Sequence, residues 1–216
     1  MSLPATRPTI YLITKGDAQD SNFDAKRREI LETIRLAVES GVSLIQLREK
    51  ALSARLLFEL TVNAASITHG SSTRLLVNDR ADIALAANAD GVHLTTTSLA
   101  TAVVRNSFPK GFIIGASTHT EKGALTAAAE GADFAVFGPV FETPDKPAPQ
   151  GISKLSEVCD KLQPFPVLAL GGVDESNVAS VLESGAAGFA AIRALNEAES
   201  LRSICCRYRN EKATAR

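Results

Sequence analysis

Polar side chains stand at the end of an apolar run early in the chain, in an arrangement suited to an anion. Gln46, Arg48 and Lys50 alternate with other residues at the end of the run 42–47. Side chains two positions apart point to the same face of a strand, so these three are predicted to share a face. Two cations and an amide on a buried strand indicate an anion site, and the structural alternative is a solvated strand end.

Two later runs end in groups that could bind a metal ion or move a proton. Asn78 and Asp79 follow one of them, and the Asp79 carboxylate could hold a divalent cation together with water and phosphate oxygens. The structural alternative is that Asp79 caps the next helix. Ser117 and His119 follow the other run, where an imidazole could act as an acid or base near neutral pH or serve only as a structural donor.

These candidates follow regularly spaced apolar runs, and the spacing predicts the fold. Between the runs lie longer stretches whose apolar residues recur at helical spacing. Eight strand–helix units in 216 residues fit an α/β protein built as a closed (β/α)8 TIM barrel. The runs span 9–14, 42–47, 75–77, 91–94, 112–115, 134–137, 167–170 and 188–192.

The residues at the joints support this alternation. Gly41 and Asn88 stand where a helix should give way to a strand, and both types adopt the left-handed conformation that ends helices. Ser53 and Asp174 stand where helices should begin. An open, doubly wound sheet is the alternative, and it is weakened because Gly16 is a single glycine where a phosphate fingerprint needs three.

The barrel assignment directs attention to loops late in the chain. The Pro-rich stretch 138–147 could close over a ligand and bring Lys146 to a phosphate, or be an ordinary exposed loop. Gly171 and Gly172 end the seventh run, and Arg193 ends the eighth. In TIM barrels the loops after strands seven and eight often form a phosphate site from backbone N–H groups.

The composition excludes several classes of function. With 45% hydrophobic residues, the chain can bury a substantial core, and a net charge of -1 with scattered basic residues gives no footprint of a nucleic-acid binder. No run is long enough to span a bilayer, and three cysteines suit neither a disulfide framework nor a metal site. We predict a cytoplasmic protein with one domain over residues 1–216, a core of about 9–207 and a polar C-terminal tail.

Taken in order, the motifs resemble the thiamine phosphate synthase family and its sister branch, the TenI-type thiazole tautomerases. The resemblance covers about residues 9–195. Its most specific parts are the segments 46–50, 77–80, 91–94, 117–120 and 169–173.

The resemblance implies an enzyme that couples a hydroxymethylpyrimidine diphosphate to a thiazole phosphate, releasing diphosphate with the help of Mg²⁺. It implies that Asp79 binds Mg²⁺ and that Ser117 and Lys146 contact the leaving diphosphate. Small homo-oligomers are also implied. The pyrimidine diphosphate would be held by Gln46, Arg48, Lys50 and Asn78, and the thiazole phosphate by Thr143 and Gly172. Gly171 and Ile192 are further candidate substrate-binding residues.

The sequence departs from the family pattern at several of these positions. Ser98 stands where synthases have an aspartate that provides a second Mg²⁺ ligand, so metal affinity should be weakened. Asp145 replaces a threonine, and Arg193 replaces a serine beside the thiazole phosphate, where it could bind the phosphate or fill the pocket. Two alternatives therefore stay open: a thiazole tautomerase with His119 as its acid–base group, and a phosphate-binding barrel without catalysis.

Overall fold

The computed structural model describes residues 7–144 and 148–208, so Lys146 and the predicted polar tail lie outside the described residues. Eight parallel strands form a closed barrel in chain order, because β1 pairs with both β2 and β8. The predicted (β/α)8 architecture is confirmed. The strands are β1 (Thr9–Ile13), β2 (Leu44–Leu47), β3 (Arg74–Asn78), β4 (Gly91–Leu94), β5 (Ile113–Thr118), β6 (Phe134–Phe137), β7 (Val167–Leu170) and β8 (Gly188–Ala191).

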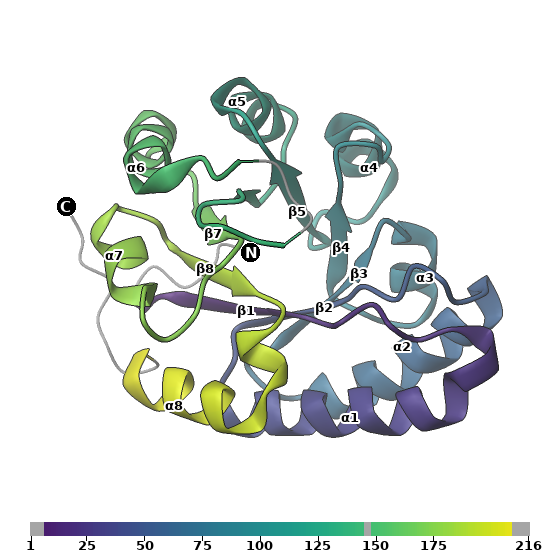
Figure 1. Cartoon of the computed structure of the whole chain (residues 1–216). Coiled ribbons are helices and arrows are strands. Elements are labelled where there is room, and N and C mark those ends of the chain that lie inside the picture. The colour runs from purple at the N-terminus through teal and green to yellow at the C-terminus, as the bar shows by residue number, and fades with distance from the viewer. Residues whose placement is uncertain (1–6, 145–147, 209–216) are drawn as a thin grey trace.

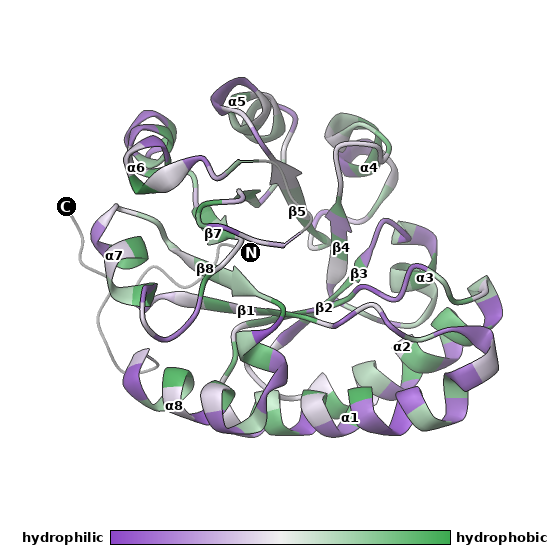
Figure 2. Ribbon diagram, viewed as in Figure 1, coloured by the Kyte–Doolittle hydropathy of each residue, from purple (hydrophilic) through white to green (hydrophobic). Residues whose placement is uncertain are grey.

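The helices surround the strands (Figure 1). Figure 2 shows α1, α2 and α8 with hydrophilic and hydrophobic residues interleaved, as expected for helices with one buried side. Among the described residues, no helix combines the length and hydropathy needed to cross a lipid bilayer. The helices are α1 (Phe23–Ser40), α2 (Ala54–Thr68), α3 (Ala81–Ala86), α4 (Thr101–Ser107), α5 (Glu121–Ala129), α6 (Gly151–Leu162), α7 (Val178–Glu183) and α8 (Ala198–Tyr208), with short 3-10 turns η1 (Asp20–Asn22) and η2 (Ala194–Asn196).

Alternation along the strands creates two apolar layers. In β1, Ile10 and Leu12 belong to the layer between strands and helices, whereas Tyr11 and Ile13 belong to a separate cluster inside the barrel. Both faces of each strand are therefore buried, which is why the strands read as continuous apolar runs rather than as alternating ones. Polar residues inside the barrel must accordingly find partners there or at its mouth.

The joints follow the predicted residue types, with one exception. Gly41 and Asn88 have φ angles of 81° and 57°, the left-handed conformation expected of them. Ser53 is the N-cap of α2, as predicted. The prediction that Asp174 begins a helix is wrong, because α7 begins at Val178. The Asp174 carboxylate instead accepts hydrogen bonds from the amide and hydroxyl of Ser176, which stabilises a turn before the helix.

Candidate functional site

Two cavities open at the carboxyl ends of the strands. The Lys50 cavity, of about 230 Å³, is formed by residues that end or follow β2, β3 and β4. The Arg193 cavity, of about 550 Å³, is formed by residues that end or follow β1, β6, β7 and β8. Given the order of strands around the barrel, the two cavities face each other across one mouth. This is the end at which TIM barrels build their active sites.

The Lys50 cavity combines two basic residues, Lys50 and Arg80, with two carboxylates and hydroxyl groups. Lys50, Asn78 and Asp79 line it together with the hydroxyl-bearing Thr95 and Thr97. Asp79 has a φ of 62°, and its amide donates to the His93 carbonyl. The N-cap of α3 is Arg80, so Asp79 does not occupy the capping position that the alternative interpretation gave it.

A buried amide beside this cavity lacks part of its hydrogen bonding. Gln46 is only 2% exposed, and its Nε2 donates to Asn78 Oδ1 at 3.0 Å. Gln46 Oε1 has no hydrogen-bond partner among the described residues. An unpaired buried acceptor is costly, so this oxygen marks a place where a ligand N–H or O–H group would be stabilised.

The strand that was predicted to place Gln46, Arg48 and Lys50 on one face is shorter than expected. β2 stops at Leu47, so Arg48 and Lys50 lie beyond the strand. Arg48 turns toward the loop after β1: a Cβ atom on Gly16 would lie 2.9 Å from Arg48 Nη1. Lys50 instead lines the cavity that contains Asp79.

Glu49 is a structural element of the site to which sequence reasoning gave no role. It is 2% exposed, and its carboxylate accepts from Thr14 Oγ1 at 2.5 Å, from the Gly16 amide at 3.1 Å and from the Ala18 amide at 2.9 Å. Glu49 thereby fixes the loop after β1 against the loop after β2. The sequence signal that could have pointed to Glu49 was its position between the basic residues Arg48 and Lys50.

Ser98, which the family resemblance places where a second metal ligand would stand, faces its own loop. Its hydroxyl accepts from the Thr95 amide at 2.7 Å and lies 3.0 Å from Thr95 Oγ1. In residues 7–144 and 148–208, no group of three or more His, Cys, Asp or Glu side chains could hold a metal ion. A metal at this mouth would therefore have to take some of its ligands from substrate and water.

The Arg193 cavity brings together the candidates from the late loops. Thr143, Gly171, Gly172, Ile192 and Arg193 all line it. Charges of both signs are present, because the lining also includes Lys15, Glu142, Asp174 and Glu197, and Lys15 pairs with Glu197 at 3.6 Å.

Gly172 is held where a side chain would not fit. Its φ is 66°, and a Cβ atom there would lie 2.6 Å from the Glu142 carbonyl oxygen. Asn177 Nδ2 donates to the Gly172 carbonyl at 2.8 Å, which anchors the turn. Backbone without a side chain lets an anion approach its N–H groups closely.

Gly172→Ala is expected to weaken binding of inorganic phosphate by about 10-fold, because the added methyl group displaces this turn. Isothermal titration calorimetry would measure the affinity. The matched control is Gly111→Ala, at a position where a Cβ atom meets nothing within 4 Å. Equal affinities of the two variants would contradict a role for this turn.

Ser117 and His119 lie at the end of β5 but have different partners. Ser117 Oγ lies 2.8 Å from Nε2 of His93, a buried histidine on β4. Burial lowers the pKa of His93 to about 3, so its imidazole is neutral at physiological pH. His119 is exposed, and its Nδ1 lies 2.5 Å from the Gly138 carbonyl oxygen. The predicted contact of Lys146 lies outside the described residues.

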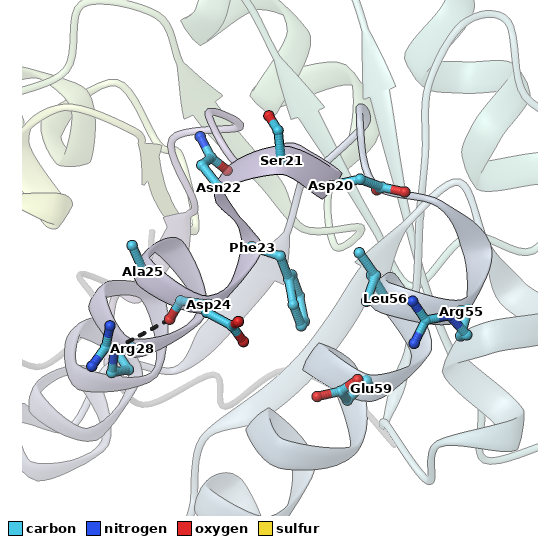
Figure 3. A pocket seen from close by; sticks show the side chains of 10 residues that line it. All are labelled: Asp20, Ser21, Asn22, Phe23, Asp24, Ala25, Arg28, Arg55, Leu56 and Glu59. Carbon is cyan, nitrogen blue, oxygen red and sulfur yellow. Dashed lines mark hydrogen bonds between the residues drawn. The ribbon is translucent and has the colours of Figure 1, made fainter.

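A third hollow, of about 570 Å³, lies between the N-terminal ends of α1 and α2 (Figure 3). Phe23 and Leu56 line it, and an ion pair of 2.6 Å between Arg27 and Glu59 joins the two helices. Charged residues of both signs surround it, as they do the Arg193 cavity. Its lining includes Asp20, Asp24, Arg28 and Arg55.

The closed barrel and the two cavities at its mouth, each lined in part by charged side chains, place the protein among the (β/α)8-barrel enzymes. The chain belongs to the thiamine monophosphate synthase family, whose model matches residues 10–195. The resemblance inferred from the motifs is confirmed.

Individual relatives agree with this assignment. A protein from Geobacter sulfurreducens is 44% identical over 190 residues, which are 87% of this chain and 86% of that protein. The thiamine-phosphate synthase of Caldanaerobacter subterraneus is 37% identical over 85% of this chain and 84% of its own length. Among solved structures, thiamine phosphate pyrophosphorylase from Pyrococcus furiosus aligns with a TM-score of 0.78 and 30% identity, covering 92% of this chain and 96% of that one.

Proposed function

We propose that the protein is a thiamine-phosphate synthase, which joins a hydroxymethylpyrimidine diphosphate to a thiazole phosphate and releases diphosphate. The observation that carries the proposal is the pair of cavities, each with basic side chains in its lining, that face each other across one barrel mouth. A reaction between two phosphorylated substrates needs two anion sites that open toward a shared centre. Relatives named thiamine-phosphate synthase support the same activity.

The Lys50 cavity suits the pyrimidine diphosphate. Lys50 would neutralise part of its charge, and we propose that Arg48, on the same loop after β2, supplies a second cation. The unpaired Gln46 Oε1 would accept a hydrogen bond from an amino group on the pyrimidine, and Asn78 fixes the orientation of the Gln46 amide. We propose that Ser117 contacts the diphosphate and that Lys146 does so as well.

The Arg193 cavity suits the thiazole phosphate. The backbone at Gly171 and Gly172 would receive the phosphate, with Thr143 and Ile192 beside it. Arg193 adds a guanidinium, which binds phosphate oxygens in a bidentate manner. We propose that Arg193 makes the phosphate contact that the family resemblance assigns to a serine at this position.

The reaction requires no protein nucleophile. The bond between the pyrimidine methylene carbon and the diphosphate oxygen breaks, and its electron pair leaves with the diphosphate. The cationic methylene is delocalised into the aminopyrimidine ring, and the thiazole nitrogen lone pair then forms the new carbon–nitrogen bond. The protein's part is to hold both substrates in line and to place cations and donors where negative charge develops.

The residues present fit one Mg²⁺ ion that arrives with the diphosphate. Mg²⁺ is commonly held by one or two carboxylates and completes its shell with phosphate oxygens and water. Asp79 would be the protein carboxylate, with the Thr95 and Thr97 hydroxyls nearby. When bound, the ion would neutralise charge on the leaving diphosphate.

The test is to incubate the purified protein with both substrates, with and without Mg²⁺, and to follow thiamine phosphate and diphosphate together. We expect both products in equal amounts and only with the metal. Substrate binding without product in either condition would overturn the proposal in favour of a binding barrel.

One observation favours a second candidate, the thiazole tautomerase. A carbonyl oxygen only accepts, so the bond between His119 and Gly138 places the proton on Nδ1 and leaves Nε2 able to take a proton from a ligand. Isomerisation of a thiazole carboxylate phosphate that is lost in His119→Ala, without thiamine phosphate formation by the unmodified protein, would establish this activity instead.

We further propose that the enzyme is cytoplasmic, that one domain spans the chain, and that its partners are small phosphorylated molecules. A small homo-oligomer is the expected assembly, and sedimentation velocity would measure it.

A further inference from the structure

Three polar side chains form a continuous hydrogen-bonded row inside the barrel. The Tyr11 hydroxyl lies 3.1 Å from His93 Nδ1, and His93 Nε2 lies 2.8 Å from Ser117 Oγ. Tyr11 and His93 are 0% and 2% exposed, whereas Ser117 is partly exposed. The row therefore runs from the barrel interior to the mouth.

The surrounding residues are shaped to hold this row. Gly115 pairs in register with His93, and a Cβ atom on Gly115 would lie 2.8 Å from His93 Nδ1 and 2.4 Å from Phe134 Cζ. The Phe134 ring meets the Tyr11 ring edge-on, with centroids 5.6 Å apart. The absence of a side chain at Gly115 thus makes room for the imidazole, and the rings around it prevent rotation.

The hydrogen bonds in the row have one consistent direction. Burial raises the pKa of Tyr11, so its phenol keeps a proton that must find an acceptor. His93 is the partner recorded for it among the described residues. Neutral imidazole carries one proton, so when Nδ1 accepts from Tyr11, Nε2 donates to Ser117. The opposite direction would leave the Tyr11 proton buried without an acceptor.

This direction determines what Ser117 can do. A hydroxyl that accepts from His93 has its own proton free to point elsewhere, and Ser117 follows the inward-facing Ile113 and Gly115 at the mouth end of β5. We propose that Tyr11 and His93 are positioning residues that hold Ser117 as a hydrogen-bond donor to the oxygen of the departing diphosphate. The inference rests on the proposed function. A donor oriented in advance needs no reorganisation as charge develops on that oxygen.

The kinetic test is a double-mutant cycle between Tyr11→Phe and Ser117→Ala. Tyr11→Phe keeps the ring and should lower kcat about 5- to 10-fold with little change in KM. In the Ser117→Ala background the same change should lower kcat less than about 2-fold, because the group it orients is gone. Tyr208→Phe is the matched control, since Tyr208 is also buried but lies on α8, and kcat should not change.

Substitutions of His93 separate the hydrogen-bonding role from packing. Glutamine can accept from Tyr11 through its oxygen and donate to Ser117 through its nitrogen, whereas methionine can only fill space. His93→Gln should retain kcat within about 3-fold, and His93→Met should lose about 10-fold. Thermal unfolding of both variants would show whether they differ in stability.

A readout independent of turnover uses the imidazole nitrogens themselves. ¹⁵N NMR of His93 should show the proton on Nε2. Titration with inorganic diphosphate and Mg²⁺ should show about 5-fold weaker binding in Tyr11→Phe and no further loss when Ser117→Ala is already present.

The outcomes separate this inference from the proposed function. A proton on Nδ1, or an equal loss from Tyr11→Phe in both backgrounds, would overturn the inference while leaving the synthase activity intact. A protein that forms no thiamine phosphate but shows the Nε2 proton and the coupled diphosphate affinities would overturn the function and retain the row as a device for binding diphosphate.

Discussion

Asp79→Asn is expected to reduce kcat/KM for thiamine phosphate formation by about 100-fold. Asp79 is the exposed carboxylate of the Lys50 cavity, whereas the Glu49 carboxylate, which also lines it, is hydrogen-bonded to the loop after β1. An amide oxygen holds Mg²⁺ far less strongly than a carboxylate does. The backbone should be undisturbed, because asparagine tolerates the left-handed φ of 62° as well as aspartate does. Initial rates measured across a range of Mg²⁺ concentrations would show a raised metal requirement.

The matched control is Asp160→Asn. Asp160 is exposed on α6, on the outside of the barrel, and the same change of charge there should leave the rate unchanged. If Asp79→Asn kept the normal rate at every Mg²⁺ concentration, Asp79 would have no part in holding the metal. Recovery of the variant's rate at excess Mg²⁺ would be the strongest support for the expected result.

Phe134→Ala is expected to lower the free energy of unfolding by about 3–5 kcal/mol. Phe134 is fully buried inside the barrel, where it packs against Tyr11 and fills the space left by Gly115. Residues from several strands meet around it, so the barrel has little freedom to collapse into the cavity. Urea unfolding followed by circular dichroism would measure the difference.

Phe58→Ala provides the comparison, because Phe58 is 39% exposed on α2. Its loss should cost less than about 1 kcal/mol. Equal destabilisation by the two variants would show that the interior aromatic cluster is not the main source of barrel stability.

Much of the fold could be predicted from local patterns. The runs 91–94, 134–137 and 167–170 coincide with β4, β6 and β7, and other strand ends differ by a few residues. The start of α7 was misplaced because Asp174 forms a turn as readily as it caps a helix. The residue types around Asp174 favour a turn and a helix start about equally, so the first residue of α7 depends on packing.

The candidate site was predictable to the extent that strand ends dictate it. Closing a parallel barrel brings all carboxyl ends to one rim, so Asn78, Asp79, Gly172 and Arg193 had to lie at the mouth once the fold was known. Their division between two facing cavities depended on the order of strands around the barrel.

The sequence by itself determined the barrel, its mouth and the residue types available there, because these follow from periodicity along the chain. Only the tertiary structure decided the partners: Glu49 binding the loop after β1, Arg48 turning toward Gly16, and His93 joining Tyr11 to Ser117. Tyr11 and His93 are 82 positions apart. Such a contact forms because β1 and β4 face each other across the closed barrel. No local sequence pattern indicates that two residues so far apart in the chain will meet.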